Sequence, residues 1–210
     1  MAGLVDRLIW LGHAGVALDF PPLVVVDPYQ VAKSSRKAGI ILVTHSHHDH
    51  LDPPSIAVLT GPETVILCAA DCLPGLPKGA RVMAPGDRIE VGGVTVAAVP
   101  AYNTNKRFHP KGSPGVGYLI TSSDGTVYHA GDTDLIPEMA EIRCDIALLP
   151  VSGTYVMTAE EAAKAAEILK PRIAVPIHYG PVAGSPGDAE RFRRLCPAGI
   201  KVVIPSQSLP

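Results

Sequence analysis

The chain has 210 residues, which is enough to bury one sizeable core and predicts a single domain spanning residues 1–210. Its formal net charge is −2, so it lacks the excess of positive charge that favours binding to nucleic acid. No apolar run approaches the roughly 18 residues of a membrane span, and residues 1–7 show no leader pattern, so we expect a soluble, cytoplasmic protein without a membrane partner.

The first part of the chain alternates short apolar runs with glycine and proline turns, which is typical of strands. A helix is predicted at residues 53–59, because Asp52 precedes two prolines in the way that an N-cap precedes a first helical turn. A strand on each side of this helix gives the spacing of a β-α-β unit. The predicted strands are residues 7–11, 16–20, 23–26, 40–43 and 64–67.

The second part contains more strands and the clearest helix. That helix covers residues 159–169, with Thr158 as N-cap, Glu161 completing a capping box and Pro171 ending it. The segment 101–114 is longer than an ordinary connection and is typical of a functional loop. Further helices are predicted at 135–141 and 188–195, and strands at 81–83, 88–91, 94–99, 116–120, 126–128, 146–149, 173–177 and 200–204.

Strands that come in two sets, with helices between them, predict an α/β (α+β) fold of two mixed sheets packed face to face with helices outside. The four cysteines lack metal-type spacing and are expected to be free thiols.

Half of the eight histidines lie in Thr44-His45-Ser46-His47-His48-Asp49-His50, directly after the apolar run 40–43. Side chains two residues apart in an extended stretch point to the same side, so His45 and His47 can bind one ion. Asp49 and His50 lie where the chain must turn and are expected to reach a second position beside the first. A metal-scavenging histidine tract is the alternative, but such tracts lack a buried strand before them and a capped helix after them.

Three later residues are suited to join this cluster. Asp132 and His178 follow apolar strands, at the ends where open sheets place their ligands, and His109 lies in the loop 101–114. With the cluster they make seven candidate ligands, enough for two divalent ions that share a carboxylate and lie about 3.5 to 4 Å apart. Zinc is the expected ion, with manganese or iron as alternatives, because imidazole and carboxylate ligands suit all three.

The order His45-x-His47-x-Asp49-His50, then Asp132, then His178 resembles the metallo-β-lactamase superfamily of hydrolases over nearly the whole chain. Within it, the chain is similar to the small single-domain branch that includes ascorbate-6-phosphate lactonase. The motifs that carry this likeness are Trp10-Leu11-Gly12-His13-Ala14-Gly15, Val26-Asp27-Pro28, Gly131-Asp132-Thr133 and Pro176-Ile177-His178-Tyr179-Gly180. The resemblance implies a four-layer αββα sandwich and a metal-dependent hydrolase that uses a metal-bound hydroxide on an ester, lactone or phosphoester-type substrate.

The resemblance also implies a role for each ligand. His45 and His47 would bind the first metal, with His109 as the third histidine, although the superfamily usually places that histidine nearer to the strand 94–99. Asp49, His50 and His178 would bind the second metal, and Asp132 would bridge the two. Asp49 and Asp132 are also the expected catalytic residues, with Asp49 receiving a proton during turnover.

For several other polar residues, and for the function, the sequence leaves alternatives open. His13 either approaches the site or is held in a turn, Asp27 either orients a ligand histidine or caps a turn, and His129 is expected to be structural. We expect a small-molecule substrate, anionic if loop cations bind it, and leave homo-oligomerisation open. The competing functions are a phosphodiesterase or RNA-processing nuclease of the same superfamily and a non-catalytic metal-binding module. The loop cations are Lys106, Arg107 and Lys111.

Overall fold

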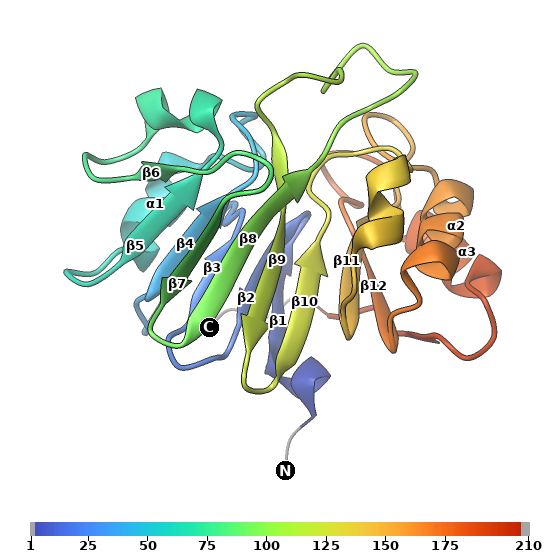
Figure 1. Ribbon diagram of the computed structural model, residues 1–210, viewed down its shortest axis with the longest axis horizontal. Coiled ribbons are helices and arrows are strands. Elements are labelled where there is room, and N and C mark those ends of the chain that lie inside the picture. Colours follow the sequence, from blue (N-terminus) through green and yellow to red (C-terminus); the bar gives the residue numbers. More distant parts are fainter. Residues whose placement is uncertain (1–2, 207–210) are drawn as a thin grey trace.

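The computed structural model describes residues 3–206 and consists of two β-sheets with helices on their outer faces (Figure 1). Residues 1–2 and 207–210, the two ends of the predicted domain, lie outside the described residues. The prediction that the chain has no leader falls partly on residues 1–2. Within the described part, no helix combines the length and apolar character that crossing a membrane would need.

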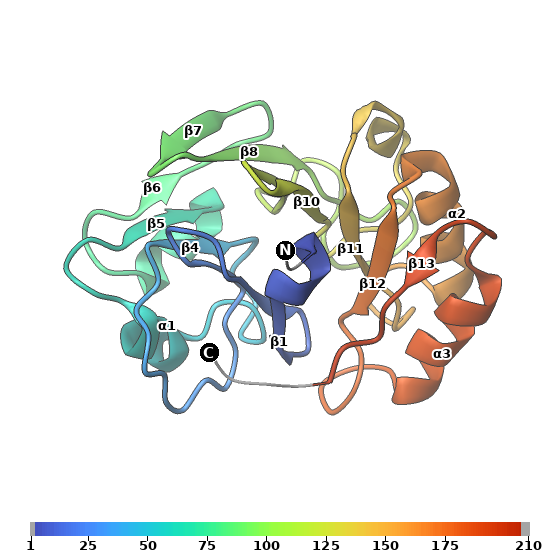
Figure 2. The same ribbon diagram turned by 90° about the horizontal axis from the view of Figure 1, so that it is seen from below.

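The first sheet contains strands β1 to β6 in chain order. β1, β2 and β3 pair antiparallel, and β3 to β6 pair parallel. The helix α1 (Pro53–Leu59) connects β4 to β5, as predicted, and lies on the outer side of this sheet (Figure 2). The strands are β1 (Leu8–Gly12), β2 (Gly15–Leu18), β3 (Val24–Val26), β4 (Ile40–Val43), β5 (Val65–Cys68) and β6 (Arg81–Val82).

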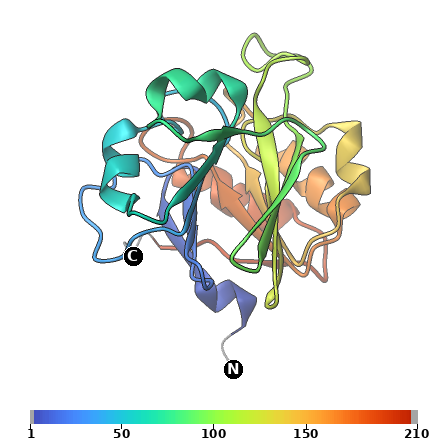
Figure 3. The ribbon, with the colours of Figure 1, turned by 60° about the vertical axis from the view of Figure 1, so that its left-hand side comes forward.

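The second sheet contains strands β7 to β13, again in chain order. β7 to β10 pair antiparallel, and β10 to β13 pair parallel. Two helices, α2 (Ala159–Leu169) and α3 (Pro186–Leu195), cover its outer face (Figure 3). The strands are β7 (Arg88–Val91), β8 (Val94–Pro100), β9 (Val116–Ser122), β10 (Gly125–His129), β11 (Ile146–Pro150), β12 (Ile173–Ile177) and β13 (Lys201–Val202).

Apolar side chains fill the space between the sheets and the space under the outer helices. Leu42 of β4 and Ile120 of β9 belong to the same buried cluster, and the Tyr118 hydroxyl of β9 donates to the carbonyl of Val43, 2.9 Å away. A second cluster, including Leu149 of β11 and Phe192 of α3, lies between the second sheet and its helices. This order of layers confirms the predicted αββα sandwich.

The differences from the predicted elements lie at their ends. A 3₁₀ helix at Leu4–Arg7 takes up residue 7, the first residue of the predicted strand 7–11. The helix predicted at 135–141 is a shorter 3₁₀ helix, Pro137–Glu141, because Ile136 is extended before the proline. The helix α3 begins two residues earlier than predicted, because Ser185 and Asp188 cap it, and β13 is shorter than the predicted strand 200–204. A 3₁₀ helix at Ala70–Gly75 is additional. The cysteines are free thiols, as predicted.

Candidate metal centre

The predicted ligands come from segments that all end at one edge of the sandwich, the upper edge in Figure 1. The segment 44–50 follows β4, Asp132 follows β10, and His178 follows β12, while the loop 101–114 rises from β8 over the same edge. Because β10, β11 and β12 are parallel, their carboxyl ends meet there. Residues far apart in sequence are therefore brought to one place.

The first group contains His45, His47, His109 and Asp132, whose ligand atoms all lie within 4.8 Å of one another. The Nδ1 atom of His47 lies 3.1 Å from Nε2 of His45 and 2.9 Å from Nε2 of His109. The Oδ2 atom of Asp132 lies 3.8 Å from Nε2 of His45 and 3.8 Å from Nε2 of His109. Three imidazole nitrogens and one carboxylate oxygen thus converge on one point.

The loop 101–114 brings His109 to this group by folding back on itself. The backbone amide of Asn103 donates to the carbonyl of His109 over 2.6 Å, and its side-chain amide donates to the carbonyl of Phe108 over 2.9 Å. Asn103 stands in the neighbourhood where the superfamily usually has its third histidine. The fold of the loop explains how a histidine six residues later can reach the same place.

The second group contains His13, Asp49, His50 and His178. Two of its histidines contact the first group through Asp132, whose Oδ1 lies 3.2 Å from Nε2 of His50 and whose Oδ2 lies 3.2 Å from Nε2 of His178. Asp49 Oδ2 lies 3.7 Å from Nε2 of His50 and 3.9 Å from Nε2 of His178. Asp132 is therefore the carboxylate that both groups share.

His13 is the member of the second group that sequence reasoning left undecided. Its Nε2 atom lies 2.9 Å from Oδ2 of Asp49, although the two residues are 36 positions apart. Its carbonyl also accepts hydrogen bonds from the Trp10 indole and from the backbone amide of His178. The turn between β1 and β2 thus holds His13 and joins it to the site, so both of the proposed readings of this residue apply.

The second nitrogen of three histidines is fixed by a neighbouring oxygen. Asp27 Oδ2 lies 2.7 Å from Nδ1 of His50, which is the contact expected of a residue that orients this ring. Ser152 Oγ lies 3.0 Å from Nδ1 of His178, and Thr44 Oγ1 lies 3.0 Å from Nδ1 of His45. Such partners set the tautomer that leaves Nε2 available to a metal. This contact of Ser152 was not predicted, because it depends on how the segment after β11 packs against the end of β12.

The donor set fits a cation. Within residues 3–206, the buried polar atoms without a hydrogen-bond partner include Nε2 of His50, Nε2 of His178 and Oδ1 of Asp132. Buried polar atoms are nearly always hydrogen-bonded, so three such atoms without a well-formed hydrogen bond, gathered around one carboxylate, fit a site for a cation among them. The deprotonated imidazole nitrogens and the carboxylate oxygen would all be satisfied by a divalent ion, whose binding would displace the proton from His50.

Burial and neighbouring charges set the ionisation of these groups. Burial lowers the pKa of His45 well below its usual value, which keeps the imidazole neutral and able to bind a metal. Burial opposes ionisation of Asp132, but His178 and His50 outweigh it and hold its pKa well below the usual range. Burial likewise opposes protonation of His50, yet Asp132 and Asp27 raise its pKa well above normal. The shared carboxylate is therefore ionised.

The backbone at the site is unusual in conformation. Residues His13, Asp27, His109 and His178 have φ between 44° and 57°, and they are four of the six non-glycine residues with positive φ in the described part of the chain. A positive φ costs a residue other than glycine about 1 to 3 kcal/mol of conformational energy. Such conformations cluster at functional sites, where the surrounding structure holds them.

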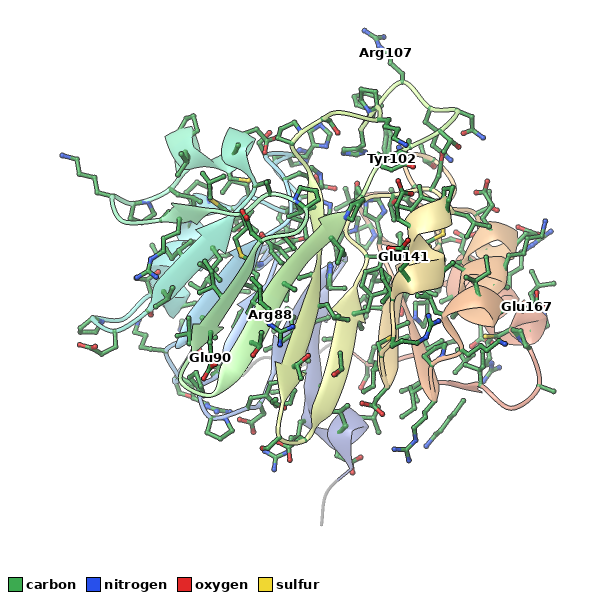
Figure 4. All side chains as sticks on the ribbon, viewed as in Figure 1. Arg88, Glu90, Tyr102, Arg107, Glu141 and Glu167 are labelled. Atoms are coloured by element: carbon green, nitrogen blue, oxygen red, sulfur yellow. The ribbon has the colours of Figure 1, made fainter. Side chains whose placement is uncertain are left out.

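Several other polar residues do not join the two groups. The His48 side chain is 81% exposed and lines the cavity beside the two groups without belonging to either. Buried His129 contacts the Ala14 carbonyl over 2.9 Å, in the structural role that was expected. Lys106 pairs with buried Asp134, and Lys111 lies 3.6 Å from Glu138. The third loop cation, Arg107, lies at the tip of the loop and points out of the molecule (Figure 4).

A cavity of about 620 Å³ opens beside the two groups. Aromatic and apolar side chains make up much of its wall. The residues that line it are Trp10, Leu11, Gly12, His13, Tyr29, Gln30, His47, His48, Asp49, Phe108, His109, Asp132, Tyr155, Pro181 and Val182.

Replacement of His109 by alanine tests whether this residue is a ligand. We expect the variant to lose about one equivalent of metal, because only two imidazoles would remain in the first group. Metal analysis of the purified protein measures the loss, and Arg107→Ala, in the same loop but pointing away, is the matched control. Unchanged metal content in His109→Ala would show that His109 is not a ligand.

Known proteins resemble this chain over most of its length. Residues 7–178 match the model of the beta-lactamase superfamily domain. A metal-dependent hydrolase from Methanopyrus kandleri is 35% identical, with 90% of each chain covered, and one from Pyrococcus horikoshii is 34% identical, with 94% of this chain and 95% of the relative covered. The crystal structure of a metal-dependent hydrolase from Parabacteroides distasonis superposes with a TM-score of 0.86 at 34% identity, covering 96% of this chain and 93% of that one.

The chain therefore belongs to the metallo-β-lactamase superfamily, as its histidine motif predicted. The chain is a metal-dependent hydrolase, because it has two groups of side chains that could hold metal and its relatives at 34% and 35% identity are metal-dependent hydrolases.

Proposed function

We propose that the two groups hold two divalent ions and that the chain hydrolyses a small ester or lactone. His45, His47 and His109 would hold one ion, and Asp49, His50 and His178 the other, with Asp132 shared. The observation that carries the proposal is the set of unpaired buried atoms on His50, His178 and Asp132, next to an open cavity. Zinc is the proposed ion, because histidine-rich sites with carboxylates suit it, and manganese or iron are the alternatives.

Two ions in this position would lower the pKa of water and neutralise the negative charge that develops on the substrate oxygen. Asp49 and Asp132 line the cavity and so contact the space where substrate would bind. Burial opposes ionisation of Asp49, but the contact of its Oδ2 with His13 Nε2, 2.9 Å away, and the nearby His50 outweigh burial and lower its pKa, so Asp49 is ionised and suited to hold a cation. The rings of His45, His50 and His178 would be held in the orientation that binds the ions by Thr44, Asp27 and Ser152.

A carbonyl ester is favoured over a nucleic acid by the cavity itself. Of the residues described, neither a lysine nor an arginine lines this cavity, whereas a nuclease needs cations along the phosphate backbone. A hydrolase panel on the metal-loaded protein should therefore show turnover of phenyl acetate or γ-butyrolactone and little turnover of bis(p-nitrophenyl) phosphate or single-stranded RNA. Turnover confined to the phosphodiesters would establish the competing function.

Metal analysis tests the first half of the proposal. Purified protein should contain between about one and two equivalents of transition metal, and the double change His45→Ala, His47→Ala should remove most of it. His48→Ala is the matched control, because His48 lies in the same segment with its side chain 81% exposed. Wild-type protein that binds no metal, or a double variant that keeps its metal, would refute the two-metal site.

A further inference from the structure

We propose that the cavity beside the two metal-competent groups selects substrates with an uncharged aromatic group next to the bond that is broken. This inference rests on the proposed hydrolase function and specifies its substrate class. It follows from an aromatic wall, from the way that wall is fixed, and from the charges that face it.

Four aromatic side chains, Trp10, Tyr29, Phe108 and Tyr155, line the cavity, and we call them the aromatic collar. Phe108 and Tyr155 come from different loops, yet their ring centres lie 5.2 Å apart at an interplanar angle of 87°. They are also 43% and 40% exposed, so the core does not need them. Two adjacent exposed aromatic rings at the mouth of a cavity are typical of a binding surface.

Buried hydrogen bonds hold the collar in place. The side-chain amide of Asn103, which is 3% exposed, donates to the carbonyl of Phe108 over 2.9 Å and to the carbonyl of Tyr155 over 2.6 Å. Trp10 stacks on Tyr179 with ring centres 5.2 Å apart, and its indole donates to the carbonyl of His13. The same Asn103 also bonds to the backbone of His109. The loop that carries a candidate metal ligand thus also positions the aromatic wall.

The collar itself carries no charged side chain, and none of the described residues that line the cavity is a lysine or an arginine. The charged carboxylates among the lining residues, Asp49 and Asp132, belong to the two metal-competent groups. The loop cations are engaged elsewhere or point away, since Lys106 pairs with Asp134 and Arg107 projects from the loop tip (Figure 4). A charge placed against the collar would lose water without gaining an ion pair, and that loss disfavours charged substrates.

The volume of the cavity matches a small molecule. At about 620 Å³, it lies within the range of roughly 300 to 1,000 Å³ that is usual for small-ligand pockets. A single aromatic ring with a carbonyl group would fill only part of it, which leaves room for a second substituent. The substrate class is therefore a small, uncharged aromatic ester or lactone.

Trp10 provides a direct binding signal, because it is the only tryptophan of the chain and lines the cavity. In the metal-loaded protein, we expect benzamide to change the Trp10 fluorescence in a saturable way. Its Kd should be at least about tenfold lower than the Kd of acetamide, which lacks the ring, and of 4-carbamoylbenzenesulfonate, which adds a charge at the far end of the ring. Equal or tighter binding of the sulfonate would overturn the proposal.

A double variant separates the collar from the rest of the site. Phe108→Ala with Tyr155→Ala should weaken benzamide binding at least about fivefold, while metal content stays unchanged. Leu195→Ala is the matched control, because Leu195 is an apolar side chain of similar exposure (45%) on α3, outside the cavity lining. Unchanged benzamide affinity in the double variant would equally overturn the proposal.

Ester kinetics distinguish failure of this proposal from failure of the hydrolase function. Benzyl acetate and ethyl acetate have leaving groups of similar reactivity, and we expect kcat/KM to be at least about tenfold higher for benzyl acetate. If the chain turned over both esters equally, the aromatic preference would be wrong and the hydrolase function would stand. If benzamide bound as predicted but no ester or lactone were hydrolysed, the proposed reaction would be wrong instead.

Discussion

Replacement of Asp132 by asparagine should lower kcat/KM by at least about 1,000-fold, which corresponds to roughly 4 kcal/mol in the barrier. Asp132 is the one carboxylate shared by both groups, with Oδ1 facing His50 and Oδ2 facing His178, His45 and His109. An amide keeps the shape of the side chain but has no charge and offers one oxygen in place of two. We therefore also expect the variant to lose metal, because two cations would lose the anion between them.

Steady-state kinetics on the best ester of the panel, with metal analysis of the same preparation, measure both effects. Asp134→Asn is the matched control. Asp134 is a buried carboxylate two residues away that pairs with Lys106 and accepts from Thr104, outside both groups. Asp134→Asn should keep its metal. Full metal content together with near-normal turnover in Asp132→Asn would exclude Asp132 as the shared ligand.

Replacement of Asp27 by alanine is expected to destabilise the protein by about 3 to 5 kcal/mol, the usual cost of removing one partner from a buried charged network. Asp27 is fully buried and accepts from the Thr44 amide over 2.8 Å, from the Thr44 hydroxyl over 2.6 Å and from Nδ1 of His50 over 2.7 Å. The truncation leaves three polar groups without an acceptor. Urea unfolding of the metal-free protein measures the change in the free energy of unfolding.

The same variant should bind one of its two metals about 10 to 100 times more weakly, because His50 would lose the partner that orients its ring. Metal titration of refolded protein measures this loss. Asp19→Ala is the control, because exposed Asp19 pairs with Arg36 on the surface, and loss of such a pair costs only about 0 to 1 kcal/mol. If Asp27→Ala were as stable as Asp19→Ala and kept both metals, Asp27 would have no orienting role.

Much of the fold could be predicted because its elements are local in origin. α1 occupies residues 53–59 as predicted, with Asp52 at the N-cap position and proline in its first turn, although the Asp52 side chain makes no cap hydrogen bond. α2 has the predicted ends, since Thr158 and Glu161 form the capping box that the sequence indicates. The 3₁₀ helix at Leu4–Arg7 was not predicted, because hydrophobic periodicity does not separate such a short turn from the start of a strand.

The parts of the site that depend on neighbouring residues in the sequence could be predicted. The parts that depend on packing between distant segments could not. His45 and His47 lie two residues apart just after β4, so their closeness could be predicted from local spacing, although the chain bends at residues 46 and 47 instead of continuing the strand. The contact between His13 and Asp49, by contrast, depends on how the β1–β2 turn packs beside the end of β4. The ion pair of Lys106 could not be predicted either. Its pairing with Asp134 depends on the path of the loop 101–114, which no local pattern specifies.

The most direct test of the two-metal site is anomalous diffraction from crystals of the zinc-loaded protein. Two zinc peaks are expected, one among His45, His47 and His109 and the other among Asp49, His50 and His178, with Asp132 contacting both. The expected peaks would assign all seven predicted ligands in one experiment. Absence of zinc from this edge of the sandwich, or a zinc ion bound elsewhere in the chain, would contradict the account.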